Sequence, residues 1–212
     1  LAVYLSQGQL MALSSTQFSD FHPVSEPLWR QMASVSDYRV PAQLRPWLSD
    51  TGSLTQRLMD ACDNRLKVQV LRQNLGVPRL SERRALKLPQ RRLALIREVL
   101  LLGGGTAWVY ARSIIPLSTL TGRLRSLRQL DNRPLGALLF SEPSMCREPV
   151  EVACFNSPTS QMPAVLAAYQ PPMWGRRSVF RLDHKPLLVS EIFLPSFSPY
   201  NQCLSFDDSR SV

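Results

Sequence analysis

Apolar and polar residues alternate in several short stretches of the chain, which is the pattern of half-buried β-strands. Leu66, Val68 and Val70, for example, are separated by polar residues. The same reading predicts strands at residues 92–102, 107–115, 150–155, 178–182 and 186–194. Three glycines at 103–105 form the turn between two of them, because glycine adopts positive φ without steric penalty. Strands joined by hairpins predict one antiparallel sheet.

Helical stretches alternate with these strands. Residues 41–48, 53–62, 117–130 and 135–140 have helical patterns. Ser53 can accept a hydrogen bond from a free amide at the start of the second helix. Pro134 stands before the last helix, where proline is tolerated. The sequence therefore predicts an α+β fold, with a single antiparallel β-sheet and helices packed on one side.

The domain organisation follows from composition. Residues 1–40 are polar and weakly periodic, and we expect a loosely packed leader. Residues 41–200 form the domain, and 201–212 are a polar tail. A proline-rich stretch at 156–173 predicts an irregular insert, with one turn of helix expected at 164–169.

Three charged residues interrupt the apolar faces of the predicted strands. Because side chains two positions apart share a face, Arg97, Arg112 and Glu191 each stand among apolar neighbours. A charge on a core face is costly unless it is partnered. Three such charges in one sheet suggest a shared pocket with net positive charge, which suits a ligand with carboxylates and a hydroxyl or ether. The alternative is a structural salt bridge between Glu191 and an arginine, with no ligand.

A fourth candidate is the backbone amide of Leu135. The first amide groups of a helix have no intrahelical partner and carry positive polarity. A helix start near a basic pocket can therefore hold a carboxylate. The adjacent residues Arg176 and Arg177 face opposite ways on a strand, so at most one can touch a ligand, and we expect structural roles for both.

Charge and cysteine content limit the function classes. The 212 residues carry 25 Lys and Arg against 16 Asp and Glu, a net charge of +9. This excess suits nucleic acid, an anionic membrane or an anionic small molecule. The densest basic run, at residues 79–92, is expected to be a solvated loop, and it lacks the aromatic residues of a single-strand binder.

The four cysteines have no paired spacing, so we expect free thiols in a reducing cytoplasm. With only two histidines beside them, no metal site is predicted. The mildly apolar start of the chain lacks a basic segment and is not read as a signal peptide. No apolar stretch is long enough to cross a bilayer.

Several ordered blocks resemble the chorismate pyruvate-lyase family. The resemblance covers roughly residues 50–200, and several blocks together are specific where any one is weak. The blocks are REVLL at 97–101, ARSIIPLSTL at 111–120, PLGALLF at 134–140, WGRRS at 174–178, KPLLVSEIFLP at 185–195 and PY at 199–200.

The resemblance implies an enclosed ligand cavity beneath helical flaps. The family's carboxylate-binding arginine falls on Arg97, its amide partner on Leu135, a second pocket arginine on Arg112 and the glutamate at the hydroxyl end on Glu191. A flap position that usually holds methionine falls on Leu54. Ala111 stands where the family often has glycine, so ligand escape is expected to differ.

The implied activity is loss of pyruvate from chorismate to give 4-hydroxybenzoate, for ubiquinone biosynthesis, with no cofactor. Arg97 and Leu135 would hold the ring carboxylate, Arg112 the enolpyruvyl carboxylate, and Glu191 the ring hydroxyl. The proton is moved either by Glu191 or within the bound substrate. We expect a cytoplasmic monomer without a nucleic-acid partner or membrane insertion. The rivals are a non-enzymatic sensor domain of the same fold and a nucleic-acid-binding module.

Overall fold

The computed structural model describes residues 26–36, 39–155 and 172–198. The start of the predicted leader, most of the insert with its expected helical turn at 164–169, and the polar tail lie outside these residues. The predicted division into leader, domain and tail therefore stays a prediction.

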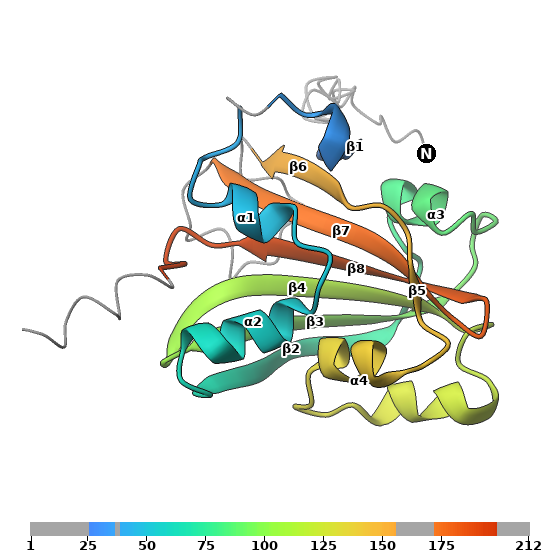
Figure 1. Ribbon diagram of the computed structural model, residues 1–212. Helices are drawn as coiled ribbons and strands as arrows, with labels where there is room; N and C mark the ends of the chain where they lie inside the picture. The colour runs from blue at the N-terminus through green and yellow to red at the C-terminus, as the bar shows by residue number, and fades with distance from the viewer. Residues whose placement is uncertain (1–25, 37–38, 156–171, 199–212) are drawn as a thin grey trace, which may run out of the picture.

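One antiparallel sheet of eight strands forms the body of the protein (Figure 1). Its order is β1-β6-β7-β8-β4-β3-β2, and β5 pairs with β7 beside β6. The predicted fold class is confirmed. The strands are β1 Arg30–Gln31, β2 Leu66–Gly76, β3 Ala94–Gly103, β4 Thr106–Pro116, β5 Cys146–Arg147, β6 Glu151–Phe155, β7 Met173–Leu182 and β8 Lys185–Phe193.

Helices cover one face of this sheet, with one exception. In Figure 1, α1, α2 and α4 lie in front of the strands. The short α3 contacts the other face through Glu82, which pairs with Arg112 of β4. The helices are α1 Arg45–Leu48, α2 Leu54–Ala61, α3 Leu80–Ala85 and α4 Leu135–Ser141, with 3-10 helices at Met32–Ser34 and Gly122–Gln129.

Several local predictions can be compared with these elements. Ser53 caps α2 by accepting a hydrogen bond from the Gln56 amide at 3.3 Å, as expected. The predicted long helix at 117–130 is wrong in length and type, because only Gly122–Gln129 is helical, as a 3-10 helix. The basic run at 79–92 is not entirely loop, since it contains α3. Glu82 stabilises the start of α3 by accepting from the Arg79 amide at 2.8 Å.

Each face of the sheet carries two apolar clusters with polar residues between them. On the face covered by α2 and α4, one cluster packs around Trp47 and Trp108, and the other around Ile115, Leu127 and Leu187. The opposite face repeats this arrangement with two further clusters. Charged side chains can therefore be buried at the middle of the sheet on both faces.

Candidate active site

A nearly closed cavity lies between the middle of the sheet, α2 and α4. Its free volume is about 40 Å³, which is room for only one to a few water molecules. The charged residues that line it are Arg97, Arg147, Arg176 and Glu191. The other lining residues are Gly52, Leu54, Thr55, Val68, Val99, Leu101, Ala111, Ser113, Pro134, Leu135, Gly136, Leu139, Phe140, Phe180 and Val189.

Strand register explains why these charges meet. In one row across the sheet, Arg97 pairs with Ser113, which pairs with Val189, which pairs with Ser178. In the row two residues along, Val99 and Ala111 are followed by Glu191 and then Arg176. Cross-strand partners point to the same face, and all of these side chains except Ser178 line the cavity.

Arg97 occupies the end of the cavity near α4. It is 2% exposed, and its Nη2 donates to the carbonyl oxygens of Asp131 at 2.6 Å and Arg133 at 3.2 Å. Its buried Nε has no hydrogen-bond partner in the described part of the chain. Burial lowers the pKa of Arg97, because the charge has lost its hydration, and the negative charge of Asp131 offsets this only in part.

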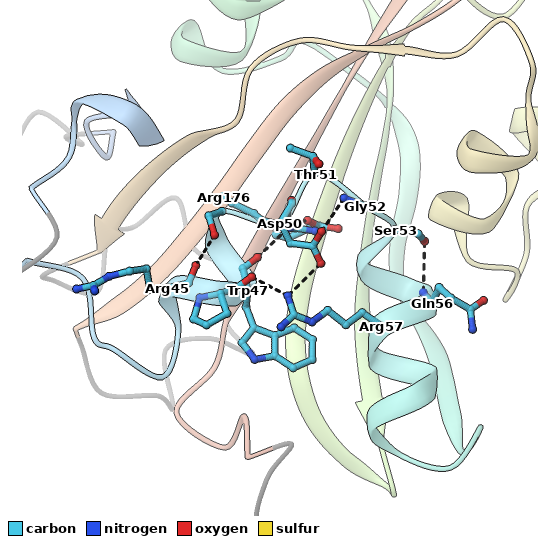
Figure 2. A network of polar contacts seen from close by, with 12 residues as sticks. Arg45, Trp47, Asp50, Thr51, Gly52, Ser53, Gln56, Arg57 and Arg176 are labelled. Atoms are coloured by element: carbon cyan, nitrogen blue, oxygen red, sulfur yellow. Dashed lines mark hydrogen bonds and ion pairs between the residues drawn. The ribbon is translucent and has the colours of Figure 1, made fainter.

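Glu191 and Arg176 form an ion pair in the second row. Arg176 Nε donates to Glu191 Oε2 at 2.7 Å. Arg176 Nη1 donates to the carbonyl oxygens of Trp47 and Asp50, each at 2.7 Å, and Figure 2 shows the side chain directed at these two residues. Arg176 is 1% exposed, so the pair fixes the Glu191 carboxylate in a set orientation.

The segment between α1 and α2 closes this part of the cavity. Asp50 accepts hydrogen bonds from the Gly52 amide at 2.7 Å and from Arg57 at 3.0 Å (Figure 2). Burial alone would raise the pKa of Asp50, but these hydrogen bonds and the charges of Arg176 and Arg57 lower it. Asp50 therefore remains a carboxylate near neutral pH and stabilises the loop that leads into α2.

The roof is built from the first turns of two helices. Leu54 begins α2 and Leu135 begins α4, and both line the cavity. Pro134 precedes Leu135 and provides no side-chain cap, and an amide in the first turn of a helix has no intrahelical partner. Gly136 lies against Thr55, where an added Cβ would be 2.7 Å from Thr55 Oγ1. The two helices thus meet directly above the cavity.

Comparison with known proteins decides the family. The family model described as Chorismate lyase matches residues 24–203. A probable chorismate pyruvate-lyase from Aromatoleum aromaticum is 44% identical over 163 residues, which is 74% of this chain and 88% of that protein. One from Azoarcus sp. is 41% identical over 182 residues, 82% of this chain and 94% of that protein.

The chain belongs to the chorismate lyase family. Among solved structures, the ligand-binding domain of a putative GntR-family transcriptional regulator from Bordetella bronchiseptica aligns with a TM-score of 0.47 at 13% identity, covering 62% of this chain and 85% of that one. No functional comparison follows from a similarity at this level. In the described residues of this chorismate lyase family member, no helix is long and apolar enough to span a membrane.

The structure brings four of the five predicted site residues of this family member to one cavity: Arg97, Leu135, Glu191 and Leu54. It does not bring Arg112 there. Arg112 neighbours Ser113, the cross-strand partner of Arg97, and therefore points to the opposite face.

On the opposite face, Arg112 is buried between two carboxylates. It donates to Glu82 through Nε at 2.7 Å and through Nη2 at 3.2 Å, and through Nη1 to Glu98. Tyr110 also donates to Glu98, at 2.9 Å. Burial alone would lower the pKa of Arg112, but the bonds and charge of Glu82, with Glu98 and Tyr110, raise it. This arginine is neutralised within the protein and cannot hold a ligand in the cavity.

Two cavity residues differ from the sequence prediction. The sequence predicts structural roles for Arg176 and Arg177, yet Arg176 lines the cavity, while Arg177 lies on the opposite face, as alternation along a strand predicts. Arg147 carries no sequence signal that predicts a place in the cavity. It lies in the two-residue strand β5, which is too short to show a hydrophobic period. Only the three-dimensional structure, in which β5 pairs with β7, places Arg147 at the cavity.

The chemistry of the chorismate lyase cavity follows from its charges. Three arginines and one glutamate leave two positive charges in excess. Glu191 is the carboxylate among the lining residues. Groups of three or more potential metal ligands are absent from the described residues. The cavity can therefore bind an anion and offer one carboxylate to it.

Proposed function

We propose that this protein is a chorismate pyruvate-lyase, which removes pyruvate from chorismate and leaves 4-hydroxybenzoate. The observation that carries the proposal is a small cavity with two excess positive charges, in which the guanidinium of Arg97 has a hydrogen-bond donor that no described residue accepts from. Chorismate is a dianion with one ring carboxylate and one enolpyruvyl carboxylate, so its charge matches that excess. Membership of the family supports the same activity.

The ring carboxylate binds at the Arg97 end. Within the described residues, Nε of Arg97 is buried and has no hydrogen-bond partner, so it can donate a charged hydrogen bond to a carboxylate. The Leu135 amide adds a second donor from the start of α4. Leu54 supplies an apolar surface in the roof for the ring.

The ring hydroxyl binds at the other end, to Glu191. Arg176 holds Oε2 of this carboxylate, which leaves Oε1 to accept a hydrogen bond from the hydroxyl. Arg97 and Glu191 stand on β3 and β8 with β4 between them, so their backbones are about 10 Å apart across the sheet and offset by two residues, about 7 Å, along the strands. Side chains reaching inward from both sides can span a six-membered ring with groups at opposite carbons.

The reaction is an elimination in which all atoms are retained. The bond between ring carbon 3 and the ether oxygen breaks, and the electron pair leaves with the oxygen of the enolpyruvyl group. The proton on ring carbon 4 is lost, the ring becomes aromatic, and the enol gains a proton at its methylene carbon to become pyruvate. The proton travels either through Glu191 or directly within the bound substrate.

We also propose that no metal ion or redox cofactor takes part. The elimination is redox-neutral, and aromatisation of the ring supplies a large driving force. The guanidinium groups of the cavity provide positive charge where negative charge develops on the ether oxygen. The arginines therefore supply the electrostatic stabilisation that a Lewis acid would otherwise offer.

The test is direct. Purified protein incubated with chorismate and excess chelator should release 4-hydroxybenzoate and pyruvate in equal amounts, measured by chromatography and a coupled pyruvate assay. Absence of both products would refute the proposed function. Activity that disappears with the chelator and returns with a divalent metal would refute cofactor independence alone.

We further propose that the 4-hydroxybenzoate enters ubiquinone biosynthesis, which is the usual role of the family. A bacterial strain that lacks its own chorismate lyase should regain ubiquinone when it expresses this chain. Restoration by added 4-hydroxybenzoate but not by the gene would contradict this role.

A further inference from the structure

Arg147 lines the cavity and forms no ion pair with any described residue. Arg147 lies in β5 beside β7, and its Nε donates to Ser178 Oγ at 3.0 Å. Its Nη1 donates to the carbonyl oxygens of Thr51 at 2.6 Å and Gly52 at 3.2 Å. Within the described part of the chain, Nη2 has no hydrogen-bond partner and the guanidinium forms no ion pair.

Its neighbour Arg176 differs in this respect. Arg176 is paired with Glu191 at 2.7 Å and is 1% exposed, so its charge is already compensated. Arg147 is only half-buried and has neutral partners, yet it lines the same cavity. Of the two arginines at this end, Arg147 is therefore the one available to an anion.

The electrostatics of Arg147 agree with this difference. Burial lowers the pKa of Arg147, and the positive charge of Arg176 lowers it further, while Glu191 and Asp50 oppose these effects only in part. The charged form of Arg147 is therefore less favourable than that of a solvent-exposed arginine. A carboxylate placed against Nη2 would stabilise the charged guanidinium, because a nearby opposite charge favours the ionised form.

The shape of chorismate brings its second carboxylate to this end. The enolpyruvyl ether is carried by the ring carbon adjacent to the one with the hydroxyl. When the ring carboxylate lies at Arg97 and the hydroxyl at Glu191, the enolpyruvyl group lies beside Glu191 and away from Arg97. Arg147 Nη1 and Arg176 Nη1 donate to the same carbonyl oxygen, that of Asp50, at 3.4 and 2.7 Å. Because Arg176 is paired with Glu191, Arg147 stands on that side of the cavity.

We propose that Arg147 binds the enolpyruvyl carboxylate of chorismate through Nη2, and so distinguishes substrate from product. This inference rests on the proposed lyase activity. It assigns to Arg147 the part that Arg112, on the opposite face, cannot play. Because Nη1 of the same guanidinium holds the carbonyls of Thr51 and Gly52, the bound carboxylate also secures the loop that closes the cavity. The product 4-hydroxybenzoate has no such group and leaves this contact empty.

The test compares substrate and product in the same variant. For Arg147→Gln, kcat/KM for chorismate should fall at least about tenfold, as expected for loss of a charged hydrogen bond. The dissociation constant of 4-hydroxybenzoate, measured by calorimetry, should stay within about twofold. Arg147→Lys keeps the positive charge but lacks the planar guanidinium. Its kcat/KM for chorismate should therefore lie between those of the wild type and Arg147→Gln.

Two controls separate the alternatives. Arg97→Gln should weaken both ligands, because both carry the ring carboxylate. Arg181→Gln alters an arginine of β7 that pairs with Glu148 outside the cavity, and should change neither value. If Arg147 only held the loop in place, Arg147→Gln would weaken 4-hydroxybenzoate as much as chorismate.

The outcomes are distinguishable from failure of the proposed function. Wild-type protein that releases no pyruvate from chorismate refutes the lyase activity and this inference together. Active wild type with an unchanged kcat/KM in Arg147→Gln overturns the role of Arg147 alone. Equal loss of both ligands, in a variant whose melting temperature is unchanged, also overturns it. If Arg147→Gln does not fold, Arg147→Lys carries the same comparison.

Discussion

Glu191 and Arg176 are cross-strand partners on β8 and β7, and their side chains form an ion pair at 2.7 Å on the floor of the cavity. The structural salt bridge considered as an alternative for Glu191 therefore exists. It is made with Arg176, and neither Arg97 nor Arg112 takes part. Because the carboxylate has two oxygens and Arg176 takes one of them, the pair is compatible with a ligand at the other.

Glu191→Gln separates structure from chemistry. Glutamine keeps an oxygen that can accept from Arg176 Nε, so the fold should survive with a loss of about 1–2 kcal/mol. Turnover of chorismate should fall about 100-fold, because the ring hydroxyl loses its ionised partner when the proton moves. Melting temperature and kcat should be measured on one preparation. A variant that melts far lower but turns over normally while folded would make Glu191 purely structural.

Arg97→Ala should weaken binding of 4-hydroxybenzoate by about 2–4 kcal/mol, because the charged hydrogen bonds to its carboxylate are lost. Calorimetric titration provides the measurement. The carbonyls of Asp131 and Arg133 lose their donor in this variant, so circular dichroism must accompany it. Unchanged affinity in a folded variant would remove Arg97 from the site.

Arg112→Met tests the buried cluster on the opposite face. Removing Arg112 leaves Glu82 and Glu98 buried without the guanidinium that donates to both of them, so the free energy of unfolding should fall by about 3–5 kcal/mol. In the fraction that is folded, neither the affinity for 4-hydroxybenzoate nor kcat/KM for chorismate should change. The triple variant with Glu82→Gln and Glu98→Gln should recover part of the stability in denaturant titrations. A stable Arg112→Met whose kcat/KM for chorismate falls while its affinity for 4-hydroxybenzoate stays unchanged would restore the original assignment of Arg112 to the enolpyruvyl carboxylate.

The face of the sheet on which Arg112 lies could not be predicted from the sequence. Alternation within β3, β4 and β8 correctly marks Arg97, Arg112 and Glu191 as charges among apolar neighbours. It cannot give the register between strands, and the register determines which side chains of neighbouring strands lie on the same face of the sheet. Since Arg97 pairs with Ser113, the charge one residue earlier falls on the far side of the sheet. The pattern thus identified buried charges but combined two separate clusters into one pocket.

Other elements were predictable to the extent that their determinants are local. The cap at Ser53 and the strands beside the glycine turn depend on neighbouring residues, and the structure confirms them. Helix α3 in the basic run depends on Glu82, which caps it and pairs with Arg112 thirty positions away. Arg147 likewise acquires its position only by pairing with β7. Contacts of this kind between distant residues leave no periodic trace in the sequence.

The cavity has to widen before chorismate can enter. A free volume of about 40 Å³ is far too small for chorismate. The contact between Gly136 of α4 and Thr55 of α2 lies above the cavity, and these two elements provide its roof. We therefore expect entry and release to involve separation of α2 from α4.

Gly136→Ala should favour that separation. Its added Cβ would lie 2.7 Å from Thr55 Oγ1 and 3.7 Å from Ser53 Oγ, so α2 or the Thr55 side chain has to move. Overpacking of this kind costs about 1–3 kcal/mol, and here the strain applies to the closed form. Release of 4-hydroxybenzoate, followed by stopped-flow fluorescence, should become faster by about fivefold or more. The double variant Gly136→Ala with Thr55→Ala removes the opposing oxygen and should return towards the wild-type rate, so the two effects should not add. An unchanged or slower release in Gly136→Ala would show that the ligand leaves by a route that does not part these helices.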